Sequence, residues 1–141
     1  MPVMVVTRLR LKDPSVLDAF FAAAVAVLEQ AKKSAGSLGS DALAEAHDTW
    51  WTVTAWADRA AMEAFVGAEP HLSTMARLDD WCDEATFADW EQASPDLPDW
   101  PTSYQHIVAE GTNADLRDPS PDQRDRKFPP PVLPAQPAGG S

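Results

Sequence analysis

Apolar and mixed positions alternate at the start of the chain. The apolar series is Val3, Val5, Thr7, Leu9 and Leu11, and the residues between them are Met4, Val6, Arg8 and Arg10. Because successive side chains of a strand point to opposite faces, this pattern predicts a strand with one mostly apolar face and one mixed face.

A three- and four-residue period replaces the alternation after Asp13-Pro14. That dipeptide supplies an N-cap acceptor and a proline at the first helical position. The apolar stripe that follows consists of Leu17, Phe20, Phe21, Ala24, Val27, Leu28 and Ala31. This spacing predicts a helix that packs one face on a sheet, and we expect Gly36 to end it.

A second strand and helix are joined in the stretch from Trp50 to Phe65. Residues 50–56 are aromatic or β-branched except for Ala55, which favours a strand, and the alanine-rich sequence after Asp58 favours a helix. A weaker strand is predicted over 38–46, paired with 50–56 through a turn at His47-Asp48-Thr49. Pro70 begins a further helical stretch to Trp81, and residues 85–91 alternate as a last strand.

The element order is therefore strand, helix, strand, strand, helix, strand, which predicts an α+β, ferredoxin-like antiparallel sheet with both helices on one face. The residues left on the other face are Met4, Val6, Trp51, Val53 and Ala55. Two helices cannot shield both faces, so a second copy of the sheet is the natural cover and a homodimer is expected.

Proline is concentrated near the end of the 141-residue chain. We expect an ordered domain over 1–112, closing with a short helix at 102–110, and a Pro-rich, largely irregular tail over 113–141. Residues 127–134 can form polyproline II, which would dock on a partner subunit or a Pro-binding module. The alternative is a poorly ordered arm.

The net charge of −11 opposes nucleic acid and anionic membranes as partners. Cys82 is the single cysteine, so no internal disulfide can form. Because the sequence shows neither a secretory leader nor an apolar run near the roughly 20 residues of a spanning helix, we expect a cytoplasmic protein.

Several of these stretches resemble the dimeric α+β barrel superfamily, in particular its antibiotic-biosynthesis-monooxygenase-like group. They are the strand 5–11, the unit 54–65, the Pro70-His71 pair and the closing Trp90-Glu91. The resemblance covers about residues 3–92. It implies a barrel formed by two sheets and a pocket between helices and sheet in each subunit. Related proteins include cofactor-independent oxygenases that make quinones from aromatic polyketides, haem-degrading monooxygenases and binding proteins.

The haem-degrading branch uses an Asn, a Trp and a His that correspond by this resemblance to Thr7, Phe65 and close to Met75. Thr7 lacks the amide, Phe65 lacks the indole N–H, and a thioether is a poor substitute for a proximal imidazole. His71, one turn earlier, is the remaining candidate for an iron ligand. We therefore expect no cofactor, with haem binding as a distant alternative.

His71 is the candidate catalytic residue, because an imidazole can take a proton from a phenol near neutral pH. The candidate substrate-binding residues are Trp50, Trp56, Thr7, Thr54, Phe65 and Met75. The two indoles offer flat apolar walls and the hydroxyls can orient a substrate oxygen. Tryptophans in a small sheet are also ordinary core, strand threonines are common β-formers, and a histidine at a helix start is often only partly exposed.

Charged residues elsewhere favour structural roles. Residues 79–84 hold four carboxylates and a thiol without zinc or calcium spacing, so we expect a solvated acidic helix end and no metal. The neighbouring acids should raise the pKa of Cys82, which argues against a thiolate nucleophile. Arg8 and Arg10 would need partners if buried, and Glu45, Asp89 and Glu91 are candidates.

The sequence thus predicts a small-molecule-binding protein, and the resemblance implies a cofactor-independent, monooxygenase-like enzyme of secondary metabolism acting on an aromatic, polyketide-type substrate. In that hypothesis His71 helps deprotonate a phenol, Trp50 and Trp56 hold the ring, and the carbanion reacts with oxygen. The alternatives are a non-catalytic protein that binds a ligand or scaffolds a partner through its tail, and a haem-binding protein.

Overall fold

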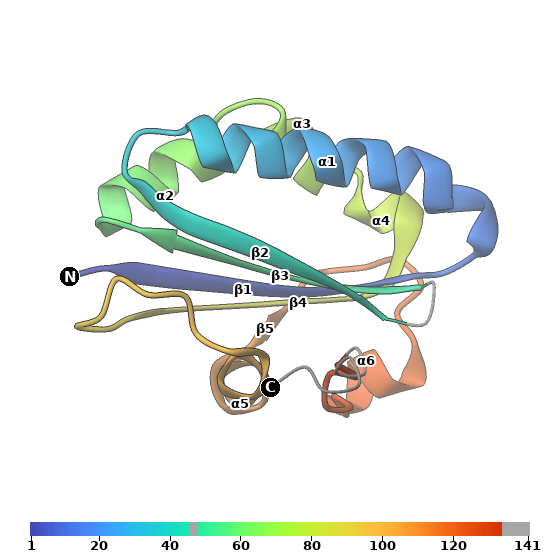
Figure 1. The fold of residues 1–141 in the computed structure, drawn as a ribbon. Coiled ribbons are helices and arrows are strands. Elements are labelled where there is room, and N and C mark those ends of the chain that lie inside the picture. The colour runs from blue at the N-terminus through green and yellow to red at the C-terminus, as the bar shows by residue number, and fades with distance from the viewer. Residues whose placement is uncertain (46–47, 134–141) are drawn as a thin grey trace, which may run out of the picture.

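The computed structural model describes residues 1–45 and 48–133, and it places helices on both faces of a five-stranded antiparallel sheet (Figure 1). The strand order is β2-β3-β1-β4-β5. The strands are β1 (Val3–Leu11), β2 (Ser37–Glu45), β3 (Thr49–Trp56), β4 (Cys82–Glu91) and β5 (Thr112–Asn113). The helices are α1 (Leu17–Lys33), α2 (Arg59–Val66), α3 (His71–Ala76), α4 (Leu78–Trp81), α5 (Trp100–Glu110) and α6 (Pro121–Asp125). The predicted α+β, ferredoxin-like class is confirmed.

Register explains how the adjacent tryptophans of β3 divide between the two faces. β1 pairs with β3 so that Leu9 lies opposite Trp50 and Arg8 opposite Trp51. Side chains alternate along each strand, so Trp50 turns toward the helices α1 to α4 and Trp51 toward the opposite layer. The predicted hairpin between β2 and β3 is confirmed in the pairing of Glu45 with Thr49. His47, placed in its turn, lies outside the described residues.

The cap residues act as the sequence indicates. Asp13 accepts a hydrogen bond from the Ser15 N–H, which begins a 3-10 turn (Pro14–Val16) ahead of α1. Asp58 accepts one from the Ala61 N–H at the start of α2. Gly36 lies just after α1 with φ +82°, and a Cβ there would meet the Cβ of Ala61 at 2.5 Å. A glycine is required at this turn for both reasons.

Helix α1 is the one element among the described residues whose length and hydropathy would suffice for a membrane span. The helical stretch Pro14–Lys33 has 20 residues and a mean hydropathy of 1.3, so the sequence does contain a run of the length that was expected to be missing. Signal sequences and the mostly buried core helices of soluble proteins pass the same test, and 11% of this stretch is buried. Here α1 lies along the sheet with Phe20 and Ala31 buried against it (Figure 1).

The sequence predicted one helical stretch from Pro70 to Trp81, and the structure differs. It forms two short helices, α3 and α4, that meet at Arg77. Leu72, counted in the apolar stripe, is 52% exposed, whereas Leu78 and Trp81 are buried. The helix breaks at Arg77, with Leu78 and Trp81 in the core beyond it and Leu72 directed to solvent before it.

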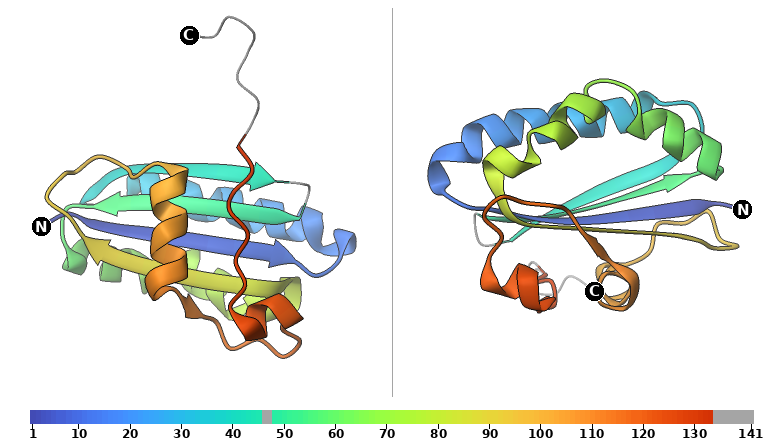
Figure 2. Two further views of the ribbon diagram at one scale, coloured as in Figure 1. Left: turned by 90° about the horizontal axis from the view of Figure 1, so that it is seen from below. Right: turned by 180° about the vertical axis from the view of Figure 1, so that it is seen from behind.

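The second face of the sheet is covered by the same chain (Figure 2). Helix α5 and the stretch up to residue 133 cross this face, where Ile107 and Phe128 pack with Val6, Trp51 and Val53. The residues that we expected a second copy to cover are at most 1% exposed. They are Met4, Val6, Trp51, Val53 and Ala55. Within this chain the face expected to meet a second sheet is therefore already covered. A homodimer stays a prediction.

The C-terminal stretch is anchored at several points. The predicted boundary at residue 112 falls inside β5, which pairs with β4. Beyond it Leu116 and Phe128 are buried, so the alternative of a poorly ordered arm does not hold for the described part of the tail. The Tyr104 hydroxyl donates to the Phe128 carbonyl at 2.8 Å, and the Val132 N–H donates to Glu45 at 2.9 Å. The division into two domains stays a prediction.

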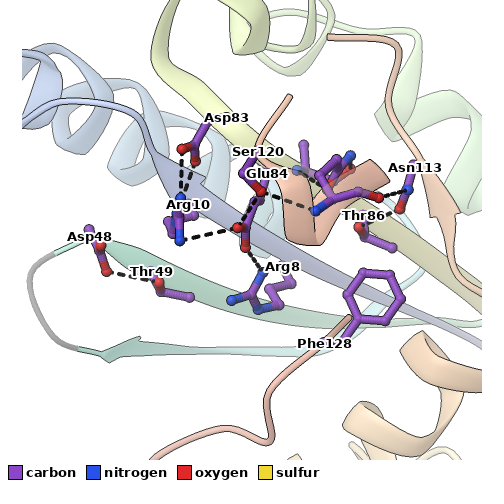
Figure 3. A network of polar contacts seen from close by, with 12 residues as sticks. Arg8, Arg10, Asp48, Thr49, Asp83, Glu84, Thr86, Asn113, Ser120 and Phe128 are labelled. Atoms are coloured by element: carbon purple, nitrogen blue, oxygen red, sulfur yellow. Dashed lines mark hydrogen bonds and ion pairs between the residues drawn. The ribbon is translucent and has the colours of Figure 1, made fainter. Parts of the chain in front are cut away.

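A buried ion pair connects the sheet to this cover (Figure 3). Arg8 donates from Nη1 to Oε1 of Glu84 at 2.6 Å, and both side chains are almost fully buried. The other Glu84 oxygen accepts from the Ser120 hydroxyl at 2.6 Å and lies 3.1 Å from Arg10, which also binds Asp83. The register of β1 and β4 places Arg10 opposite Glu84 and Arg8 opposite Thr86, so both arginines lie within reach of Glu84.

Two expectations about charged residues are corrected by this network. The partners of Arg8 and Arg10 are not Glu45, Asp89 or Glu91, and Arg59 takes the last two instead. The acidic run 79–84 is not wholly solvated, because Glu84 is 2% exposed. Burial, followed by the charge of Asp83, raises the pKa of Cys82 to about 12, so the thiol is not a thiolate at neutral pH.

We expect Glu84→Ala to lower the free energy of unfolding by about 3–5 kcal/mol, because it leaves the Arg8 guanidinium buried without a countercharge. The double variant Arg8→Met, Glu84→Leu should lose much less. Asp89→Ala is the control: it removes an exposed ion pair with Arg59 and should cost about 1 kcal/mol or less. Urea denaturation measures all three, and equal losses for Glu84→Ala and Asp89→Ala would contradict the assignment.

We expect Phe128→Ala to loosen the cover of the sheet, at a cost of up to about 3 kcal/mol in unfolding free energy. Cleavage by trypsin after Arg126 and Lys127 should become faster. Val132→Ala, in the same stretch but 69% exposed at the native residue, is the matched control. Tryptic digestion followed by mass spectrometry gives the rates, and identical rates for both variants would show that the stretch is not held by Phe128.

Candidate functional site

A cavity of about 140 Å³ lies between α1, α3 and the face of the sheet that carries these helices. From α1 it is lined by apolar side chains, among them Phe20, Phe21, Ala24 and Val25. From the sheet it is lined by Leu9 of β1, Ala42 of β2, and Trp50, Thr52 and Thr54 of β3. Phe65, His71, Thr74, Met75 and Leu78 complete the wall.

The cavity separates two parts of the core on this face. One cluster contains Leu9, Phe20 and Leu78, and another contains Ala31 and Phe65, and all five residues also line the cavity. Alanines at 24, 31 and 42 stand where larger side chains would fill the space. Small residues on α1 and β2 therefore keep the two clusters apart.

His71 is held in one orientation at the start of α3. Its Nδ1 lies 3.0 Å from the Val66 carbonyl oxygen. Because a carbonyl can only accept, Nδ1 carries the proton in the neutral ring and Nε2 keeps its lone pair. The imidazole also lies against the Phe65 ring, with centroids 4.7 Å apart, and Phe65 stacks in turn on Trp56 at 4.8 Å.

Gln30 of α1 fixes the chain around His71. Its Oε1 accepts the His71 backbone N–H at 2.8 Å, while its Nε2 donates to the carbonyls of Phe65 at 3.1 Å and Ala68 at 3.3 Å. One amide thus ties α1 to the end of α2 and the beginning of α3. The histidine position depends on this contact between helices.

The cavity is electrically neutral. None of the described residues that line it is Asp, Glu, Lys or Arg. Burial lowers the pKa of His71, and the hydrogen bond to Val66 opposes this only in part. The imidazole is therefore uncharged at neutral pH, which suits a proton acceptor.

The opposite end of the cavity is aromatic. Trp50 lies against Phe20 and Phe21, with ring centroids 5.6 and 5.8 Å away. Its buried Nε1 has no hydrogen-bond partner among the described residues. The Thr54 hydroxyl, by contrast, accepts from Trp56 Nε1 at 2.9 Å. Phe21 and Val25 are 51% and 44% exposed, so the cavity opens to solvent beside them.

Five of the seven residues singled out from the sequence line this cavity, namely Trp50, Thr54, Phe65, His71 and Met75. Trp56 does not, because it is fully buried behind Phe65. Thr7 is not among the lining residues either. Thr52, which the sequence indicated as a strand hydroxyl beside Thr7 and Thr54, lines the cavity too, and the residues that sequence reasoning passed over are Thr74 and Gln30. Thr52 shares the strand parity of Trp50 and Thr54, and Thr74 lies one turn after His71, whereas nothing in the sequence indicated Gln30.

The site does not fit a metal or haem. The described residues contain no group of three His, Cys, Asp or Glu side chains arranged to hold a metal ion. A cavity of about 150 Å³ in another protein holds benzene, so 140 Å³ cannot enclose a porphyrin. The size of the cavity therefore does not support the hypothesis of a haem-binding protein.

Comparison with known proteins adds the family. A family model described as antibiotic biosynthesis monooxygenase matches residues 2–77, which is more than half of the chain. The chain belongs to this family. The predicted resemblance is thus confirmed, although the matched range ends before β4, which the resemblance was expected to include. No curated protein matches the sequence significantly.

Solved structures share the fold at low identity. Rv0793 from Mycobacterium tuberculosis has a TM-score of 0.59 and 18% identity, over 67% of this chain and 100% of its own. NE2512, a protein of unknown function from Nitrosomonas europaea, has a TM-score of 0.57 and 20% identity, over 70% of this chain and 95% of its own. SnoaB, a cofactor-independent oxygenase from Streptomyces nogalater, has a TM-score of 0.52 and 14% identity, over 66% of this chain and 94% of its own. At these identities the likeness shows the fold, which is that of a monooxygenase-like, small-molecule-binding family.

We expect the pKa of His71 in the folded protein to lie below 6.5, as measured by its ring resonances in an NMR titration. Since the unfolded chain takes up the proton first as pH falls, this group stabilises the fold fully above pH 6.5, and the stabilisation is lost as pH falls toward the folded-state pKa. His71→Gln should remove that part of the pH dependence of unfolding. A folded-state pKa above 6.5 would contradict the burial argument.

Proposed function

We propose that this protein is a cofactor-independent, monooxygenase-like enzyme acting on an aromatic, polyketide-type phenol in the cavity between α1, α3 and the sheet. The observation that carries the proposal is His71, a neutral imidazole whose proton is held at Nδ1 by Val66 and whose Nε2 remains available to a ligand. Membership of the monooxygenase family supports it.

The reaction needs only the phenol and dioxygen. His71 Nε2 takes the hydroxyl proton, and the electron-rich phenolate carries its excess electron density at a ring carbon. That carbon gives one electron to dioxygen, and combination of the resulting radicals forms a C–O bond and a peroxide. The imidazolium returns its proton as the O–O bond breaks, and loss of the C–H proton leaves a quinone and one water. Substrate CxHyOz plus O₂ thus gives CxHy−2Oz+1 plus H₂O.

The surroundings of the cavity favour the first step. A neutral base creates no unpaired buried charge before it acts, and burial keeps it in the neutral form. Away from the opening beside Phe21 and Val25, the apolar walls limit the access of water to a reactive carbanion. The aromatic groups Phe65 and Trp50 are placed to contact a flat ring from the two ends of the cavity.

A second candidate is a protein that binds an aromatic ligand without turning it over. The observation in its favour is that His71 Nδ1 donates to a backbone carbonyl and not to a carboxylate, so the imidazolium gains no countercharge. Scaffolding through the tail is less favoured up to residue 133, because that stretch already binds its own sheet. A cytoplasmic location and a place in secondary metabolism stay predictions.

Oxygen uptake with electron-rich phenols tests the proposal, using 5-pentylresorcinol and 1,8-dihydroxyanthrone as probes. We expect the native protein to consume oxygen with at least one of them. His71→Gln should slow turnover by about 100- to 10,000-fold, because the general base is lost. Leu72→Gln, the neighbouring exposed position outside the cavity wall, is the control.

Two results would contradict the proposal. If neither phenol increases oxygen uptake above its rate in buffer, or if His71→Gln turns over as fast as Leu72→Gln, His71 is not the base of an oxygenase. Binding without uptake would favour the second candidate.

A further inference from the structure

We propose that the cavity takes an uncharged, one-ring phenol with an apolar substituent, its hydroxyl at His71 and its substituent directed toward the opening beside Phe21 and Val25. The inference narrows the substrate class and rests on the proposed function only for the role of His71. Size, charge and the arrangement of the two ends carry it independently.

Size limits the ring system. The volume of about 140 Å³ compares with the cavity of about 150 Å³ that accepts benzene in another protein. The lining residues of β3 run from Trp50 to Thr54, a rise of about 13 Å along the strand. The same volume spread over that length makes a narrow space. It suits one ring and a chain in line. In 1-anthrol the hydroxyl points along the short axis of the fused rings, so with that hydroxyl at His71 the three rings would lie across the narrow space.

Charge limits the substituents. The described wall contains four side chains able to hydrogen-bond through N or O besides Trp50, namely Thr52, Thr54, Thr74 and His71, and none of these is charged at neutral pH. A carboxylate or phosphate placed here would lose its water without meeting a cation, which costs several kcal/mol. The ligand must therefore enter as a neutral molecule, with the hydroxyl proton still attached.

The two ends of the cavity set the direction. At one end His71 lies on Phe65 at 4.7 Å, so a hydroxyl bound to Nε2 keeps its ring beside an aromatic wall. At the other end the contacts are Phe20 and Trp50, whose buried Nε1 is not open to a ligand. Phe21 and Val25 reach solvent there, so an apolar chain longer than the cavity can continue over them.

Isothermal titration calorimetry of the full-length protein tests the class with 4-pentylphenol, 4-pentylbenzoate and 1-anthrol. We expect saturable binding of 4-pentylphenol at one site per chain. The carboxylate should bind at least about tenfold more weakly because its charge is desolvated. The three-ring phenol should also bind at least about tenfold more weakly because it does not fit. Equal or tighter binding of either one overturns the inference.

Two alanines on β2 give a matched pair of variants. Ala42 lines the cavity, whereas Ala44, two residues along the same face, does not. We expect Ala42→Leu to fill part of the space and weaken 4-pentylphenol binding at least about tenfold, while Ala44→Leu leaves it within about twofold. Both positions are exposed on an edge strand, so circular dichroism should report a native fold for both. Equal affinity of the two variants would place the ligand elsewhere.

These measurements separate the inference from the proposed function. Selective binding of 4-pentylphenol without oxygen uptake by 5-pentylresorcinol supports the ligand class and rejects the oxygenase. Oxygen uptake with 1,8-dihydroxyanthrone alone supports the oxygenase and rejects the one-ring limit.

Discussion

Both faces of a single antiparallel sheet have to be buried, and the rest of this structure follows from how the chain meets that requirement. One face receives α1 to α4 and the other receives α5 with the stretch to residue 133. An unpaired apolar face of this size would otherwise need a second molecule. Here Phe128 and Ile107 supply the apolar contacts, and the Arg8–Glu84–Ser120 contacts hold the cover in register.

The two faces are not packed in the same way, and the difference is where function is expected. On the face with α5, bulky side chains such as Trp51 and Ile107 close the core completely. On the face with α1, alanines leave a neutral cavity with a polar group at one end. The same apolar surroundings that keep His71 uncharged also exclude ionic ligands, so one physical property sets both the protonation state of the base and the kind of molecule it meets.

Much of the fold could be read from the order of residues. The alternation in β1, the stripe of α1 and the caps at Asp13 and Asp58 are local signals, and each of these elements is present. The site was harder to foresee. His71 and Trp50 stand out by residue type, but Gln30 became important only because the packing of α1 on α2 and α3 brings it to the backbone of His71. Trp56 looked like a pocket wall and is instead covered by Phe65.

The sequence by itself determined the class of fold and the inward parity of Trp50, because periodicity, caps and strand alternation act over a few residues, and its likeness to known proteins gave the family. Only the tertiary structure decided which acids pair with Arg8 and Arg10, that the chain covers its own second face, and that a narrow neutral space lies beside His71. Those outcomes depend on register between β1 and β4 and on contacts between segments far apart in the chain. No local pattern encodes them.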